Sequence, residues 1–95
     1  MAANARLYGA RPLLLCGDFN DQPSSRVYAK LSETFADTWL LAGVGEGFTF
    51  SSAQPRRRID YIWCSKGDGL MPRKVWVAST DASDHLPLVA EFTWR

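Results

Sequence analysis

The stretch that decides the fold is a short, mostly apolar run in the second half of the chain, Arg58-Ile59-Asp60-Tyr61-Ile62-Trp63-Cys64. In an extended strand, successive side chains point to opposite faces, so Ile59, Tyr61 and Trp63 share one face of this run. The other face carries Ile62, Cys64 and a single carboxylate. Because both faces are largely apolar, the run predicts a strand in the centre of a sheet, covered on both sides.

The elements around this strand indicate a mixed α/β domain. The apolar run Leu13–Cys16 predicts a buried strand that stops at Gly17. Pro23–Ser25 predicts a helix start with a serine cap. The apolar side chains that follow at helical spacing predict that one helix face packs against the sheet; they are Val27, Tyr28, Leu31 and Phe35.

Two later runs, Lys74–Ala78 and Leu86–Trp94, alternate as strands do. The predicted order is therefore strand, helix and three strands. This is one sheet of about four strands with one main helix. A single helix covers only one face of such a sheet. We therefore expect the other face to be covered by further polypeptide or by a second copy of the chain.

Length and composition set the limits of this interpretation. The 95 residues allow one domain, with 46% hydrophobic and 22% charged residues and a net charge of +1. The aromatic content excludes a disordered chain, and the charge gives no general case for nucleic acid. Residues 1–11 are expected to be a flexible or helical lead-in. They lack an apolar signal core and no membrane-spanning run follows, so the sequence as given predicts a cytoplasmic protein, although a longer parent could be exported.

The two cysteines, Cys16 and Cys64, lie in apolar runs without a C-x-x-C pair or a Cys/His cluster. This spacing argues against a zinc site. Buried free thiols are the simpler interpretation, and a disulfide between neighbouring strands stays open.

Polar residues occur in three places where a core would not put them. The most informative is Asp60, because an unpaired carboxylate on an apolar face costs several kcal/mol. It needs a partner, and the candidates are Arg58, which is expected on the same face, and His85. A carboxylate that accepts a hydrogen bond from an imidazole orients it and raises its basicity, as in a general base. The alternative is a structural Asp60–Arg58 ion pair.

The other two polar stretches follow the first strand and precede the last one. Asp18 and Asn20 are two residues apart in an extended segment and would face the same side. A carboxylate beside an amide suits hard cations and phosphate, although Gly-Asp and Asn-Asp pairs are also common in turns. Asp84 and His85, the only histidine, stand where a loop enters the last strand.

Taken together, the three stretches resemble the last three signature blocks of the endonuclease/exonuclease/phosphatase superfamily. These stretches are Gly17-Asp18-Phe19-Asn20, Arg58-Ile59-Asp60-Tyr61-Ile62 and Ser83-Asp84-His85-Leu86-Pro87-Leu88. Lesser features resemble its bacterial members: Pro23, Tyr28, Asp37 and Gly47–Phe50. The resemblance runs from about residue 11 to 95 and identifies the chain as the C-terminal half of that fold.

The resemblance implies half of a four-layer α/β sandwich with an active site at one end, between two halves. It implies that His85 lies next to the scissile phosphate, paired with Asp60. Asp18 would orient or deprotonate the attacking water, and Asn20 would bind the phosphate. Asp84 would help to hold a divalent metal, Mg²⁺ or Mn²⁺. The reaction would be in-line attack of water on a phosphodiester or phosphomonoester, of a kind that includes nuclease and phosphodiesterase activity.

The chain departs from the family pattern in one respect. The family's N-terminal half supplies a metal-binding glutamate, and Met1–Leu15 contains no glutamate. We therefore expect weak Mg²⁺ binding and a truncated chain that is weakly active or inactive. The alternative is a non-catalytic remnant that forms a homodimer or binds a partner. The sequence does not choose among DNA, RNA, lipid and inositol phosphate substrates.

A basic run, Arg56-Arg57-Arg58, precedes the central strand. It could contact the phosphates of a substrate or a nucleic acid. The alternative is a solvated loop in which Arg58 pairs with a carboxylate.

Overall fold

We describe the fold from a computed structural model, which describes residues 12–67 and 69–94. The lead-in expected over residues 1–11 lies outside these residues. The elements follow the order β1 (Leu14–Asp18), α2 (Arg26–Ser32), β2 (Phe35–Asp37), α3 (Thr38–Ala42), β3 (Asp60–Ser65), β4 (Leu70–Val77) and β5 (Leu88–Trp94). In the described part of the chain, no helix is long and apolar enough to cross a membrane.

The first sheet has three antiparallel strands in the order β1-β3-β2. The prediction that β3 is the central strand is confirmed. β1 pairs with β3 from Leu14 opposite Cys64 to Asp18 opposite Asp60. β2 pairs with the other edge of β3, where Asp37 lies opposite Trp63. This register places two carboxylates side by side at one end of the sheet.

The second sheet is a hairpin of β4 and β5, whose register runs from Leu70 opposite Trp94 to Val77 opposite Leu88. The mixed α/β class is therefore confirmed, but the expectation of a single sheet of four strands is corrected. Alternation identified both late strands without indicating their partner, and they pair with each other rather than with β3. Phe35, which was expected on the helix, begins β2 instead, because α2 ends at Ser32. The sequence analysis did not predict β2 or α3.

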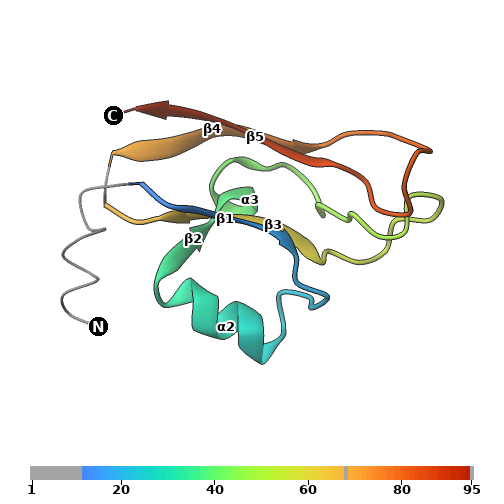
Figure 1. Cartoon of the computed structure of the whole chain (residues 1–95), viewed down its shortest axis with the longest axis horizontal. Helices are drawn as coiled ribbons and strands as arrows, with labels where there is room; N and C mark the ends of the chain where they lie inside the picture. Colours follow the sequence, from blue (N-terminus) through green and yellow to red (C-terminus); the bar gives the residue numbers. More distant parts are fainter. Residues whose placement is uncertain (1–11, 68, 95) are drawn as a thin grey trace.

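The three-stranded sheet lies between α2 and the β4–β5 hairpin (Figure 1). Helix α2 begins as predicted, because the Ser25 side chain accepts a hydrogen bond from the Tyr28 amide at 3.1 Å. The Tyr28 ring packs on Trp63 and Tyr61, with centroids 5.1 and 5.6 Å apart. Trp63 and Tyr61 are buried, so this face of β3 forms the core.

The two cysteines differ in environment. Cys64 on β3 is buried, as predicted, whereas Cys16 on β1 is exposed, which corrects the prediction for that residue. β1 is an edge strand, and the described part of the chain leaves it uncovered. Cys16 lies opposite Ile62 rather than Cys64, and no disulfide joins the two cysteines.

Candidate active site

The site begins with a cross-strand pair of carboxylates. Asp18 ends β1, Asp60 begins β3, and the two residues are direct antiparallel partners. Direct partners project from the same face of a sheet with their Cβ atoms about 5 Å apart, so the two like charges oppose each other. A positive charge placed between them, either a protonated base or a metal ion, would relieve that repulsion.

His85 reaches this pair from the loop before β5. A backbone bridge joins His85 to Phe50, and the Leu86 amide donates to the Thr49 carbonyl at 2.7 Å. The His85 ring also packs on the Phe50 ring, with centroids 5.0 Å apart. The segment around Phe50 therefore sets the position of the imidazole.

The imidazole bridges the two carboxylates. His85 Nδ1 lies 2.7 Å from Asp60 Oδ2, and His85 Nε2 lies 3.5 Å from Asp18 Oδ2. Donation of the Nδ1 proton to Asp60 fixes the ring and turns Nε2 towards Asp18. The side chains are 18% exposed for Asp60, 26% for His85 and 44% for Asp18, so the group opens towards solvent at Asp18.

This environment raises the pKa of His85 above its usual value of 6.5. The main cause is the hydrogen bond to Asp60, and the negative charges of Asp60, Asp18 and Asp84 add to it, while burial opposes it. The shift favours the charged form of His85, in which both ring nitrogens can donate hydrogen bonds.

Asn20 and Asp84 lie beside this group. Asn20 has a left-handed backbone, with φ of 57°, which corrects the expectation that it continues the extended segment of Asp18. Its backbone amide donates to Asp18 Oδ1 at 2.8 Å. This bond leaves Asp18 Oδ2 directed at His85. The Asp84 carbonyl accepts from the Ser52 amide at 2.8 Å, and its side chain is exposed. The roles expected for the Asn20 and Asp84 side chains, binding of phosphate and of a metal ion, stay predictions.

The donor set fits a divalent cation. One ligand atom each from Asp18, Asp60 and His85 lies within 4.8 Å of the others. Two carboxylates suit Mg²⁺ or Mn²⁺, and the imidazole is also acceptable to Mn²⁺. Asp84, the ligand expected from the resemblance, is not a member of this group.

A groove of about 450 Å³ opens beside the charged group. Asp60, Ser83 and His85 line its polar end, while Cys16 and Ile62 belong to its apolar wall. Leu86, Pro87 and Leu88 complete that wall. Two members of the charged group, Asp60 and His85, therefore line an open groove between β1, β3 and the start of β5, and Asp18 follows the lining residue Gly17.

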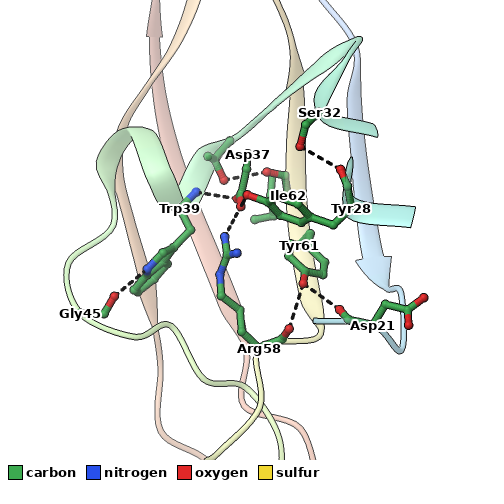
Figure 2. Close-up of polar contacts among 10 residues, drawn as sticks. Asp21, Tyr28, Ser32, Asp37, Trp39, Gly45, Arg58, Tyr61 and Ile62 are labelled. Carbon is green, nitrogen blue, oxygen red and sulfur yellow. Dashed lines mark hydrogen bonds and ion pairs between the residues drawn. The ribbon is translucent and has the colours of Figure 1, made fainter. Parts of the chain in front are cut away.

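Arg58 does not face Asp60, which corrects the expectation from strand alternation. β3 begins only at Asp60, so the preceding backbone is outside the ladder and the alternation does not extend to Arg58. Its guanidinium instead pairs with Asp37 and lies 4.9 Å from the centre of the Tyr61 ring. Figure 2 shows this buried pair with the Tyr28 hydroxyl, which donates to Asp37 at 2.7 Å.

The arginine run is therefore divided. Arg58 is buried in the ion pair, whereas Arg56 and Arg57 are exposed. Sequence reasoning did not identify Asp37 as the partner of Arg58, or Phe50 as the neighbour of His85. An aspartate directly before a short apolar run was a usable signal for Asp37, because this residue caps α3 by accepting from the Trp39 amide at 3.0 Å.

Comparison with known proteins now gives the family. Residues 1–85 match the profile described as "Endonuclease/Exonuclease/phosphatase family". The chain belongs to this family. No curated protein matches it.

Solved structures agree with this assignment. A functionally unknown conserved protein from Enterococcus faecalis V583 is 26% identical, with a TM-score of 0.75 over 100% of this chain and 43% of that one. The human Nocturnin catalytic domain with bound sulfate anion is 28% identical, with a TM-score of 0.71 over 99% and 38%. The endonuclease/exonuclease/phosphatase from Bacteroides vulgatus is 21% identical, with a TM-score of 0.78 over 99% and 41%, and supports the fold alone. The chain spans about two fifths of the length of these relatives.

Proposed function

We propose that the group of Asp18, Asp60 and His85 hydrolyses a phosphoester with the help of a divalent cation. One observation carries the proposal: three segments far apart in the sequence bring two carboxylates and an imidazole within 4.8 Å of one another, and Asp60 and His85 of this group line a groove. The family of the chain supports the same reaction class. Perturbed titratable groups gathered at a cleft are typical of catalytic sites.

In the proposed step, Asp18 accepts a proton from water as the water oxygen forms a bond to phosphorus. Asp18 suits this role because it is the most exposed of the three side chains. The bond from phosphorus to the leaving oxygen breaks, and that oxygen takes the electron pair and is protonated by solvent. His85, held through Nδ1 by Asp60, donates from Nε2 to a phosphate oxygen and neutralises its charge.

A bound Mg²⁺ or Mn²⁺ would neutralise the charge that develops on the phosphate oxygens. Asp18 and Asp60 would hold it, with the exposed Asp84 carboxylate as the third group expected from the family motif. Asn20 would donate its side-chain amide to the phosphate. We propose that these residues belong to the C-terminal half of the family fold, because their blocks resemble its last three. These residues alone would then bind Mg²⁺ weakly, because the metal-binding glutamate of the family belongs to the other half.

The test is Mg²⁺-dependent hydrolysis of bis(4-nitrophenyl) phosphate by the purified chain, with His85→Ala as the comparison. We expect slow turnover that requires the metal and falls at least about a hundredfold in the variant. Ser79→Ala, a change outside the site, is the matched control. No turnover from a folded wild-type chain at high concentration, or equal turnover in His85→Ala, would contradict the proposal.

A second candidate is a non-catalytic module that binds a second copy of the chain or another partner. Three consecutive leucines on and before β1 favour it, since Leu13, Leu14 and Leu15 are 41%, 49% and 38% exposed. Light scattering distinguishes the two candidates, because a strictly monomeric, well-folded chain at all concentrations would oppose this one.

A further inference from the structure

A row of three side chains extends from the proposed catalytic group. Phe50 is bridged on one side to His85 and on the other to Arg57, both antiparallel. The Phe50 and Arg57 backbones exchange two hydrogen bonds, of 3.1 and 2.9 Å. Direct antiparallel partners project from the same face, so Arg57, Phe50 and His85 project together.

The members of this row differ in chemistry. His85 and Phe50 are in ring contact, with centroids 5.0 Å apart, and both are half-buried. Arg57 is exposed, and no ion pair joins it to an acidic group in residues 12–67 and 69–94. The row therefore offers a partly accessible aromatic ring between a phosphate-binding imidazole and an unpaired guanidinium.

Neighbouring strands lie about 4.8 Å apart, so the backbones of His85 and Arg57 are separated by two such steps, about 10 Å. This separation is comparable with a nucleotide and its two flanking phosphates. Proteins commonly bind single-stranded nucleic acid by stacking a base on an aromatic ring and holding a phosphate with an arginine. A base in a duplex is already stacked and paired and is not free to lie on Phe50.

We propose that Phe50 and Arg57 form a subsite for single-stranded nucleic acid, with a base on Phe50 and the next phosphate on Arg57. This inference rests on the proposed function, because the row places the scissile phosphate at His85. It names the substrate class that the family alone leaves open. Arg56 provides an internal comparison, since it is also exposed but is not a bridge partner of Phe50.

The experiment measures binding separately from cleavage. Fluorescence anisotropy of a labelled ten-residue oligothymidylate is recorded in EDTA for the whole chain and its variants. We expect Arg57→Ala to weaken binding about fivefold to tenfold and to reduce the salt slope by about one. Arg57→Lys should keep the salt slope, and Arg56→Ala should change the affinity less than about twofold. Equal effects of Arg56→Ala and Arg57→Ala would overturn the proposal.

The base contact is tested with an abasic oligomer of the same length. The wild-type chain should prefer oligothymidylate by at least about fivefold, and Phe50→Leu should remove that preference. Because Phe50→Leu changes packing beside His85, its melting temperature is measured, and the abasic affinity of the same variant serves as its reference. Equal binding of both oligomers, stronger binding of a duplex, or no binding by the wild-type chain would contradict the proposal.

The two proposals fail separately. Binding with these variant effects but no metal-dependent turnover would retain the subsite and reject the hydrolase. Turnover of bis(4-nitrophenyl) phosphate that depends on His85, without the expected binding pattern, would retain the hydrolase and reject the nucleic-acid subsite.

Discussion

Two ionic clusters lie near the start of β3. The closed cluster is built on Arg58 and the open cluster on Asp60, although these two residues are only two positions apart in the sequence. Arg58 pairs with Asp37, and these side chains are only 7% and 2% exposed. Asp60 pairs with His85, at 18% and 26% exposure, and faces the exposed Asp18. The first cluster is enclosed between β3, β2 and α2, while the second opens on the groove.

The difference between the clusters is one of hydrogen-bond satisfaction. Both carboxylate oxygens of Asp37 are used, since Oδ1 accepts from the Trp39 amide and Oδ2 accepts from Tyr28 and Arg58. In the open cluster, Asp18 Oδ2 and His85 Nε2 are 3.5 Å apart, which is long for a hydrogen bond, so Nε2 can donate to another group. A satisfied buried network stabilises the fold, whereas an unsatisfied exposed one is available to bind.

The largest expected effect follows removal of the buried cation. Arg58→Met leaves Asp37 buried beside an apolar chain, and breaking a buried pair by removing one partner costs about 3–5 kcal/mol. Urea unfolding of the variant measures this loss. Arg57→Met, at the adjacent exposed position, should change the unfolding free energy by less than about 0.5 kcal/mol. Similar losses in the two variants would refute the contrast.

Alkaline pH should lower the stability that Tyr28 and Tyr61, beside the buried Arg58–Asp37 pair, contribute to the fold. Burial is the main cause of the raised pKa of Tyr61 and Tyr28, and the charge of Asp37 adds to it. A raised folded pKa means that the unfolded chain loses these protons first, from about pH 10. Their contribution is complete below that pH and is lost as pH rises towards the folded pKa values.

Urea midpoints from pH 8 to 11 test this sign, with a slope of up to about 1.4 kcal/mol per pH unit for each tyrosine. Tyr61→Phe should flatten the decline, although it also removes hydrogen bonds to the Asp21 and Arg58 carbonyls. An unchanged pH profile in Tyr61→Phe would show that Tyr61 does not contribute.

Divalent ions should stabilise the protein only by binding at the open cluster of Asp18, Asp60 and His85. A cation at about ten times its dissociation constant stabilises the native state by about 1.4 kcal/mol. The melting temperature should therefore rise by several degrees when MgCl₂ or MnCl₂ is added at about 10 mM, a concentration chosen because binding is expected to be weak. The shift should disappear in Asp18→Asn and persist in Asp81→Asn, an exposed aspartate outside the group. Equal shifts in both variants would place the ion elsewhere.

The smallest expected effect is the titration of His85. Its pKa should exceed 6.5 in the absence of metal, mainly because of the hydrogen bond to Asp60. The associated stability is complete below the unfolded pKa of about 6.5 and is lost as pH rises through the folded value. NMR of the single imidazole gives this pKa directly. Asp60→Asn should lower it, and an equal value in both proteins would exclude the proposed pairing.

The sequence predicted the open cluster better than the closed one. Apolar runs identified β1 and β3, and three short blocks indicated that Asp18, Asp60 and His85 would meet. The position of Arg58 was wrong because alternation holds only inside a ladder, and the ladder begins at Asp60. The role of Phe50 was missed because isolated bridges in a loop leave no periodic pattern.

The sequence pattern also did not predict that the strands divide into two sheets. Alternating apolar residues in β4 and β5 predict that each forms a strand, but the choice of partner depends on the hairpin that joins them. The roles expected for Asn20 and Asp84 remain predictions, because they depend on a phosphate and a cation.

The most direct test compares one change on each side of β3. Asp60→Asn and Asp37→Asn are measured in parallel for Mg²⁺-dependent hydrolysis of bis(4-nitrophenyl) phosphate and for urea unfolding. The account predicts that Asp60→Asn lowers turnover at least about a hundredfold with little change in the free energy of unfolding. Asp37→Asn should lower the free energy of unfolding by several kcal/mol. The reverse pattern, or full turnover in Asp60→Asn, would contradict the assignment of the open cluster as the catalytic one.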